Sequence, residues 1–311
     1  MRVAAFFAGC GGLDLGFRNA GFDIAYANDI DPVVWETYEK NHKLVVDKRS
    51  IIEVPSDEVP DVVGIIGGPP CQSWSLAGEM RGIDDPRGKL FYEYARVLQD
   101  KRPLFFLAEN VPGLISSAHF NEFKKIVNKL SNIGYTISYK LLDARNYGVP
   151  QERKRVIIVG YRKDLKKKFE FPTPTHSDIQ FNRIDGKKMG KWVTLSEAIG
   201  DLPTVVPALP KNKANTYTQL PNHEYMTGGF STIYLSRNRR KEWGNQSFTI
   251  HDCGRHAPLH PSSSKMQKVS TDKWVFDDAD NVRRMSVREC ARIQTFPDEF
   301  IFHYKNVSDG Y

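Results

Sequence analysis

The sequence contains few cysteines, and their placement excludes two classes of small scaffold. Its 311 residues include 4 cysteines. Cys10, Cys71, Cys253 and Cys290 lie far apart and form no Cys-x-x-Cys pair. Such spacing favours neither a disulfide framework nor a ribbon-type zinc site. We therefore expect a protein of a reducing compartment.

Long hydrophobic runs are also missing. No stretch approaches the ~20 apolar residues that span a bilayer, and the apolar start at residues 3–8 is better interpreted as a buried strand than as a signal peptide. A composition of 40% hydrophobic and 26% charged residues, with a mean hydropathy of -0.47, is typical of a soluble globular protein. The length allows two domains, and we expect no membrane contact.

Acidic residues are outnumbered by basic ones. Lys and Arg total 44 against 37 Asp and Glu, which gives a formal net charge of +7 and a pI near 9.1. The basic side chains gather in two separate regions, at 153–168 and at 237–241. This distribution fits a cleft that holds a charged backbone, with two solvated faces as the alternative.

Short apolar runs alternate with amphipathic segments over the first 160 residues. Such alternation is typical of a mainly parallel sheet that is covered on both faces. We predict a doubly wound, Rossmann-like α/β domain over 1–165 and a smaller, loop-rich domain over 166–280. A C-terminal segment, 281–311, with a capped helix at 286–294, is expected to return to the first domain. The predicted strands are 3–8, 23–28, 62–68, 104–110, 136–144 and 155–161.

A glycine-rich turn follows the first predicted strand. Gly9, Gly11 and Gly12 would let the backbone approach a ligand beside free N–H groups at a helix start. Asp29, about 20 residues downstream, is placed to bind ribose hydroxyl groups. The spacing is not Gly-x-Gly-x-x-Gly, which disfavours an NAD-dependent dehydrogenase. A nucleoside with an uncharged or zwitterionic tail, such as S-adenosylmethionine, fits better.

Two chemically active side chains follow apolar runs. Cys71 comes after Gly-Gly-Pro-Pro, a rigid turn that presents a thiol, and Glu109 lies near the end of the run 104–110. A thiolate beside a carboxyl group suits attack on an electron-poor ring carbon while a ring nitrogen is protonated. Arg153 and Arg155 would point to one face if extended and would favour the thiolate. The alternatives are an inert cysteine, a strand cap and a solvated basic strand.

These segments together resemble the cytosine-C5 DNA methyltransferases. FAGCGGLDLGF, GGPPCQSWS, AENVPGL and QERKR occur in the order and approximate spacing of that family. RGIDDPRGKLFYEY, PNHEY, STIYLSRNRR and VRECARIQTFPDEFIFHY are similar to the HaeIII-type bacterial modification enzymes that act on GGCC. The resemblance covers most of the chain. It implies an S-adenosylmethionine-dependent methyltransferase domain joined to a target-recognition domain.

The resemblance also implies where and on what the enzyme acts. It would methylate the inner cytosine of GGCC in double-stranded DNA, as a monomer of a restriction-modification system. Its place would be the bacterial cytoplasm, at the DNA of the nucleoid. Cys71 would add to C6 of a flipped-out cytosine and Glu109 would protonate N3. Arg153 and Arg155 would hold the base and the thiolate region.

Further residues receive binding roles by the same resemblance. The loop after the cysteine, 72–87, would close over DNA. The residues implied to line the cofactor are Phe7, Gly9, Gly11, Gly12, Asp29, Ile30, Ser50, Ile51, Pro70 and Leu90. The residues implied to contact DNA are Gln72, Ser73, Ser75, Arg81, Arg87, Arg237, Arg239 and Arg240.

Sequence-specific reading is expected from the second basic region. Arginine suits guanine because it can donate to O6 and N7 together. We expect Arg237 and Arg239 to read guanines and Arg240 or Lys241 to contact phosphate. The alternative is that all of these side chains contact phosphate.

Two positions depart from the family pattern. Ser50 stands where the family has an aspartate that contacts the adenine of the cofactor. The 311 residues contain no Gly-Asn-x-Val-Pro segment, so we expect a shortened or damaged enzyme, or a split one completed by a segment in trans. The alternatives are a catalytically impaired DNA-binding protein and an RNA cytosine-C5 methyltransferase.

A histidine-rich segment is a candidate metal site. His251, Cys253, His256 and His260 offer four ligand side chains, but their spacing matches no common zinc pattern. No metal is therefore expected.

Overall fold

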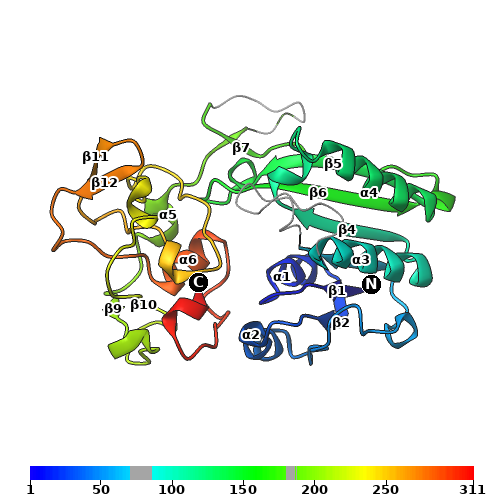
Figure 1. Cartoon of the computed structure of the whole chain (residues 1–311), viewed down its shortest axis with the longest axis horizontal. Helices are drawn as coiled ribbons and strands as arrows, with labels where there is room; N and C mark the ends of the chain where they lie inside the picture. The colour runs from blue at the N-terminus through cyan, green and yellow to red at the C-terminus, as the bar shows by residue number, and fades with distance from the viewer. Residues whose placement is uncertain (71–85, 180–185, 187) are drawn as a thin grey trace. The chain divides into compact units, whose positions relative to one another are not determined.

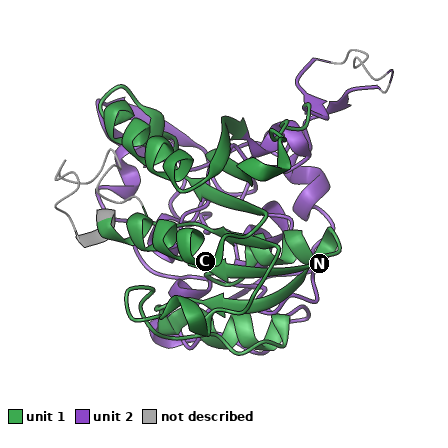
Figure 2. Cartoon of the chain, turned by 90° about the vertical axis from the view of Figure 1, so that its right-hand side faces the viewer, with its two compact units in different colours: residues 1–142, 154–173 green, residues 143–153, 174–311 purple. Residues whose placement is uncertain are grey.

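The fold contains two compact units (Figure 2). We describe a computed structural model, which covers residues 1–70, 86–179, 186 and 188–311. Unit 1 comprises residues 1–142 and 154–173, and unit 2 comprises residues 143–153 and 174–311. Residues 281–311 lie within unit 2, and their predicted return to the first domain stays a prediction. The exchange of 143–153 into unit 2 was also not expected. The functional roles of the two units stay predictions.

Unit 1 is built on one six-stranded sheet with the strand order β2-β1-β3-β4-β6-β5 (Figure 1). The neighbours among β1 to β4 pair in parallel, whereas β6 runs antiparallel to β4. The predicted α/β class is confirmed, and the β4–β6 pair departs from the parallel arrangement. The strands are β1 (Arg2–Phe6), β2 (Asp23–Asn28), β3 (Gly64–Gly67), β4 (Phe105–Asn110), β5 (Tyr135–Asp143) and β6 (Lys154–Arg162).

Within the described ranges, four α-helices connect these strands, and the starts of α1 and α2 follow local sequence signals. At α2 the Asp31 carboxylate accepts from the N–H of Val33 at 2.9 Å, and Pro32 occupies the first helical position. At α1 the chain enters through Gly11 with φ +87°, a conformation that favours glycine. The helices are α1 (Gly12–Asn19), α2 (Pro32–His42), α3 (Pro86–Lys101) and α4 (Phe120–Asn132).

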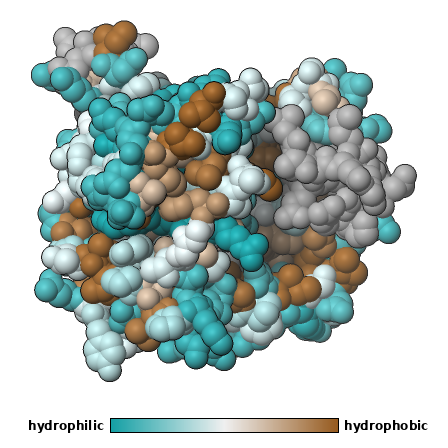
Figure 3. All heavy atoms as spheres, turned by 60° about the vertical axis from the view of Figure 1, so that its left-hand side comes forward, coloured by the Kyte–Doolittle hydropathy of each residue, from teal (hydrophilic) through white to brown (hydrophobic). Residues whose placement is uncertain are grey.

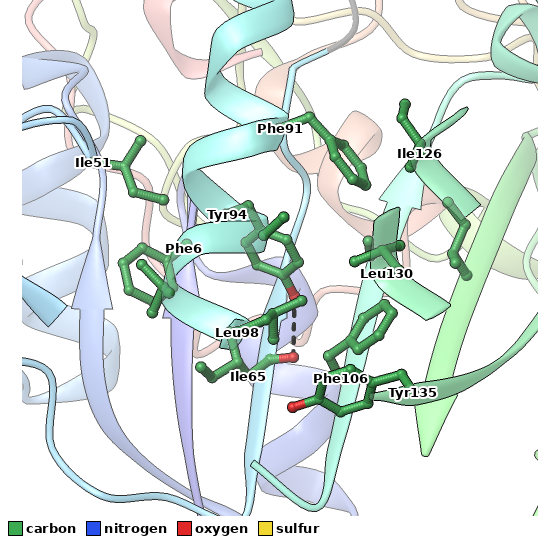
Figure 4. Close-up of a cluster of buried hydrophobic side chains, with 14 of the residues drawn as sticks. Phe6, Ile51, Ile65, Phe91, Tyr94, Leu98, Phe106, Ile126, Leu130 and Tyr135 are labelled. Carbon is green, nitrogen blue, oxygen red and sulfur yellow. Dashed lines mark hydrogen bonds between the residues drawn. The ribbon is translucent and has the colours of Figure 1, made fainter. Parts of the chain in front are cut away.

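The main core of unit 1 lies between the sheet and helices α3 and α4 (Figure 4). Tyr94 in α3 is fully buried, and its hydroxyl donates to the carbonyl oxygens of Ile65 in β3 and Leu107 in β4 at 3.1 and 3.0 Å. Its ring meets those of Phe6 and Phe106 edge-on. A buried hydroxyl with two acceptors avoids the desolvation cost of an unpaired group. This packing fixes the strands that end at the site described below.

Unit 2 is rich in loops, as predicted. Its secondary elements are β7 (His176–Ser177), β8 (Gly190–Lys191), α5 (Leu195–Ile199), β9 (Val206–Pro207), β10 (Glu224–Tyr225), β11 (Met266–Ser270), β12 (Lys273–Phe276) and α6 (Val287–Ile293). Short 3-10 helices occur in both units, at η1 (Ser56–Glu58), η4 (Pro112–Ile115), η5 (Ala144–Tyr147), η6 (Lys163–Leu165), η7 (Pro210–Asn212), η8 (Tyr234–Ser236), η9 (Gly254–His256) and η10 (Val307–Gly310).

Helices α5 and α6 pack together in one hydrophobic cluster of unit 2. Both begin with a capping box, and the one predicted at Ser286 and Glu289 is present. Arg288 in α6 is fully buried because its guanidinium donates to the carbonyl oxygens of Pro221, Pro297 and Phe300. Carbonyl acceptors thus replace water around a buried cation.

The surface mixes residue types. Figure 3 shows a face on which hydrophobic residues are scattered among hydrophilic ones. Among the described residues, no helix combines the length and apolar character needed to cross a membrane.

Candidate active site

The ends of four strands meet at one edge of the sheet in unit 1. Phe6 in β1 pairs with Asn28 in β2 and with Gly67 in β3, and Gly67 pairs in turn with Ala108 in β4. Because β1 to β4 run parallel, the segments that follow them leave at the same edge. Open α/β sheets build their ligand sites at this carboxyl edge. The glycine turn, Asp29, the Gly-Gly-Pro-Pro segment and Glu109 all lie along it.

The turn after β1 has an unusual backbone. Phe7, Gly9 and Gly11 adopt positive φ angles of 54°, 57° and 87°. Positive φ is uncommon for a residue with a side chain, and at Phe7 it marks a conformation that the surrounding structure imposes. Gly12 then opens α1, and no side chain caps this helix start.

The Asp29 carboxylate ties this turn to the next segment. Its Oδ2 accepts from the N–H of Gly9 at 2.7 Å, and its Oδ1 accepts from the N–H of Asp31 at 2.9 Å. Burial raises the pKa of Asp29, although these two backbone bonds lower it. Each carboxylate oxygen can accept a second bond. The carboxylate therefore keeps capacity for the ribose hydroxyl groups predicted as its ligands.

The other predicted cofactor residues differ in exposure. Ile30 is 63% exposed beside Asp29, which is unusual for a side chain of its size and leaves an apolar face at the edge. Ile51 is buried in the core of unit 1, so only its backbone is left to reach a ligand. The Ser50 hydroxyl accepts from the N–H of Ile52 at 3.4 Å, and the Ser50 N–H donates to Glu53. Phe7, Leu90 and Pro70 are half-buried.

Glu109 and Arg155 form an ion pair at the end of β4. Arg155 Nε lies 2.7 Å from Glu109 Oε1, and the two side chains are 20% and 33% exposed. The pairing follows from the antiparallel register, which sets the start of β6 beside the end of β4. The sequence predicted both residues as catalytic, and the structure brings them together.

The second oxygen of Glu109 faces the segment after β3. A Cβ placed on Gly68 would lie 3.6 Å from Glu109 Oε2. The Asn110 side-chain amide donates to the carbonyl oxygen of Pro69 at 3.0 Å. These contacts hold the Gly68–Pro70 segment against the end of β4. In the sequence this segment leads directly to Cys71.

Several predicted residues cannot be placed. Cys71, Gln72, Ser73, Ser75 and Arg81 lie outside the described residues, as does the side chain of Arg87.

Arg153 does not share the surroundings of Arg155. It belongs to unit 2, where its Nη1 donates to the carbonyl oxygen of Ile250 at 3.3 Å and its own carbonyl accepts from the N–H of Ala144 at 2.9 Å. The QERKR segment is therefore divided between the units. A joint action of the two arginines on one base stays a prediction.

The predicted arginine readers of unit 2 have distinct environments. Arg237 is exposed. Arg239 is only 8% exposed, and its guanidinium donates to the carbonyl oxygens of Tyr234 and Ile233 at 3.0 and 3.3 Å. Arg240 donates to the carbonyl oxygen of Ser263 at 2.7 Å and pairs with Glu242. Arg240 would have to leave internal partners in order to contact phosphate.

Two histidines that the sequence offered as metal ligands lie beside this arginine cluster. The rings of His251 and His256 are 6.2 Å apart, in an edge-on arrangement. Burial lowers the pKa of both, and the nearby Arg237 and Arg239 lower it further. Within the described ranges, no group of three or more His, Cys, Asp and Glu side chains is placed to hold a metal ion.

A polar group beneath the glycine turn was not predicted from the sequence. Asp14, Tyr38 and His42 are buried between α1 and α2. A Cβ on Gly11 would lie 2.0 Å from Nε2 of His42, so the imidazole packs directly against this glycine. The acidic residue in Gly-Gly-Leu-Asp and the aromatic spacing of α2 were available as signals, but helical periodicity alone does not say that they meet.

Comparison with known proteins identifies the class. The chain belongs to the C-5 cytosine-specific DNA methylase family, whose profile matches residues 1–311. The predicted family and activity are confirmed: the protein is a DNA cytosine-C5 methyltransferase of the Type II kind found in restriction-modification systems. Enzymes of this family use S-adenosylmethionine as the methyl donor.

Individual relatives match along nearly their whole length. The chain is 57% identical over 314 residues to the Type II methyltransferase M.MthTI of Methanothermobacter thermautotrophicus, with 100% of this chain and 91% of that protein covered. It is 48% identical to M.FnuDI of Fusobacterium nucleatum, covering 100% of this chain and 88% of that protein. A solved structure of a prophage-encoded DNA modification methyltransferase from E. coli has a TM-score of 0.70 at 26% identity, covering 100% and 92% of the two chains.

Proposed function

We propose that this chain methylates C5 of the inner cytosine in GGCC, after that base has left the duplex. The Glu109–Arg155 pair beside Gly68–Pro70 carries the proposal. A carboxyl group is held there by a cation at one oxygen, while its other oxygen faces the segment that leads to Cys71. The carbon to be methylated is stacked inside a duplex, so such a site acts on an extruded base.

The chain's own groups have complementary roles in this reaction. The Cys71 thiolate adds to C6 and forms a C–S bond, and Glu109 donates a proton to N3 so that electron density reaches C5. C5 would then take the methyl group, which leaves the donor as a neutral thioether. A base removes the C5 proton, the C5–C6 double bond re-forms as the C–S bond to Cys71 breaks, and N3 returns its proton to Glu109. Arg155 occupies one oxygen of Glu109, which fixes the carboxyl group for contact with the base through the other.

The residues around the glycine turn fit S-adenosylmethionine, which supplies the methyl group when bound. The positive φ angles at Gly9 and Gly11 bring bare backbone to the edge, and Asp29 keeps acceptor capacity for ribose. The exposed Ile30 offers an apolar surface to an adenine ring. Ser50 and Ile51 are left with weaker roles, because Ser50 lacks a carboxylate and the Ile51 side chain is buried.

Recognition of GGCC is assigned to unit 2. Arg237 is exposed and free to enter a major groove. The guanidinium of the neighbouring Arg239 is held by a backbone carbonyl oxygen. The support for GGCC itself is the resemblance of the STIYLSRNRR and PNHEY segments to enzymes with that target. One copy of the chain suffices for this chemistry, so we propose that it acts as a monomer.

A protection assay tests the target. Plasmid DNA is incubated with the protein and S-adenosylmethionine, digested with an endonuclease that cuts unmethylated GGCC, and sequenced after bisulfite conversion. The proposal predicts full protection and conversion resistance at the inner cytosine alone. Methylation at another sequence would overturn the GGCC assignment but keep the activity. Methyl transfer to tRNA in place of duplex DNA would favour the RNA alternative.

A further inference from the structure

A buried carboxyl group lies next to the glycine turn without a complete set of partners. Asp14, in the first turn of α1, is 1% exposed. Its Oδ1 accepts from the hydroxyl of Tyr38 at 2.8 Å. Its Oδ2 has no hydrogen-bond partner among the residues that the structure describes. A buried polar atom without a partner costs stability, so its retention calls for a functional reason.

Tyr38 and His42 hold this carboxyl group and the turn together. Their rings stack with centroids 4.4 Å apart and planes 23° apart. His42 packs so closely on Gly11 that only glycine fits there. Arg18 at the end of α1 donates to the carbonyl oxygen of His42 at 3.4 Å. The network thereby links α1, α2 and the turn into one rigid piece.

The network carries one negative charge near neutral pH. Burial raises the pKa of Asp14 to about 6, although the bond from Tyr38 lowers it. Burial and Arg18 lower the pKa of His42 to about 4, so its imidazole is neutral. Cys10, within the turn, has its pKa raised to about 11 by burial, with Asp14 and Asp29 adding to the shift. The carboxyl groups of Asp14 and Asp29 thus both act on the turn.

We infer that the Asp14–Tyr38–His42 network is a positioning device for the methyl donor and that its carboxylate favours the donor over the spent product. The inference rests on the proposed cofactor site. S-adenosylmethionine carries a positive sulfonium, whereas the sulfur of S-adenosylhomocysteine is neutral. A buried anion beside the turn attracts the sulfonium and leaves the product sulfur unaffected. Asp14 thus promotes exchange of product for donor after each turnover.

Calorimetric binding of S-adenosylmethionine and S-adenosylhomocysteine, from pH 5 to pH 8, tests the inference without turnover. In the wild-type protein the preference for S-adenosylmethionine is expected to rise by about threefold to tenfold as Asp14 ionises. The ratio of the two Kd values cancels the ionisations that both ligands share. Asp14→Asn should give a ratio that does not change with pH.

Tyr38→Phe provides a second, milder variant. It keeps the ring stack but removes the bond that lowers the pKa of Asp14, so the rise in preference should move to higher pH. Tyr135→Phe is the matched control, because Tyr135 is equally buried and its hydroxyl donates to Pro103. It should leave the wild-type curve unchanged.

The outcomes separate the two claims. If the wild-type protein binds neither ligand, the proposed cofactor site is wrong. If it binds both and the Kd ratio is flat with pH, or if the Asp14→Asn or Tyr38→Phe curve matches the wild type, the role of the network is wrong. A purely structural network would weaken both ligands equally and leave their ratio untouched.

Discussion

The two units place charged side chains by different means. In unit 1 the register of a regular sheet sets Glu109 beside Arg155. In unit 2 the arginines proposed to contact DNA, Arg237, Arg239 and Arg240, lie on irregular chain, and backbone carbonyl oxygens hold Arg239 and Arg240. The comparison suits a proposal in which the chemistry depends on the regular sheet edge and target choice depends on loops, which tolerate sequence change.

The largest effect is expected at the sheet edge. Glu109→Gln keeps the shape of the side chain but removes the acid, so kcat should fall by about 10²- to 10⁴-fold. Binding of GGCC duplex should change little, because we propose that the specific contacts come from unit 2. Single-turnover methylation and a gel-shift assay measure the two separately. Near-normal methylation by this variant would remove Glu109 from the mechanism.

The units should also respond to pH with opposite signs. The folded pKa of Asp14 is raised to about 6, so its contribution to the free energy of unfolding is full below the ordinary carboxyl pKa and is lost as pH rises toward and through 6. In unit 2 burial alone would raise the pKa of Glu289, but the bonds from Arg283 outweigh it and lower the pKa. That contribution is present above the ordinary pKa and is lost as pH falls through the lowered one.

Denaturant unfolding of Asp14→Asn and Glu289→Gln between pH 4 and pH 8 tests this contrast. Ionisation of Asp14 should lower the free energy of unfolding of the wild type by up to about 3 kcal/mol. The wild type should lose stability as the pH rises because Asp14 ionises, and Asp14→Asn should abolish that loss. The wild type should also lose stability as the pH falls because Glu289 becomes protonated, and Glu289→Gln should abolish that second loss. Equal pH curves for both variants and the wild type would contradict the assigned shifts.

Within unit 2, we expect the exposed Arg237 to act in base recognition alone and the buried Arg239 to contribute to stability as well. Arg237→Ala is expected to reduce the preference for GGCC over a one-base mismatch by about 1–3 kcal/mol without changing Tm, because the side chain is exposed. Arg239→Ala should lower Tm as well, since it leaves two carbonyl oxygens unpaired. Competition binding and thermal unfolding report both. If Arg237→Ala kept its preference for GGCC over the mismatch, Arg237 would be assigned to a phosphate contact instead.

The two ends of β6 offer a matched pair of arginines. Arg155→Ala should lower kcat by about tenfold to a hundredfold, because Glu109 loses the bond that orients it. Arg162→Ala removes an ion pair with Asp164 at the other end of the strand and should leave kcat unchanged. Initial rates with saturating DNA and cofactor make the comparison. Equal losses would point to general damage of the sheet.

The smallest effect is expected from a methyl group at the turn. Gly11→Ala combines a positive φ with a clash against His42 and should cost about 1–2 kcal/mol of stability, together with weaker binding of S-adenosylmethionine. Gly16→Ala is the control, since a Cβ there meets nothing within 4 Å and lies on a helix. Denaturant unfolding and calorimetry measure the pair.

Local signals in the sequence were reliable for helix starts. The capped helix at 286–294 was predicted, and its capping box at Ser286 is present, because a cap depends on neighbours within a few residues. The alternation of strands and helices predicted a mainly parallel sheet, but the strand order at the active edge comes from the structure. Family resemblance then supplied the roles of Cys71 and Glu109, which periodicity alone could not.

The rest depends on contacts between distant residues. Nothing local shows that His42 packs on Gly11, since the two lie on separate elements that meet only in the fold. The burial of Arg239 could not be predicted either, because a run of basic residues is ordinarily expected to be exposed. The transfer of residues 143–153 to unit 2 involves bonds such as that from Arg153 to Ile250, far along the chain.

Covalent trapping tests the central claim most directly. A GGCC duplex with 5-fluorocytosine at the inner position is incubated with the protein, with and without S-adenosylmethionine, and run on a denaturing gel. Fluorine cannot leave C5 as a proton does, so release of Cys71 is blocked. We predict a cofactor-dependent adduct that is absent with a scrambled duplex and with Cys71→Ala. Specific binding of the duplex without any adduct would contradict the proposed chemistry.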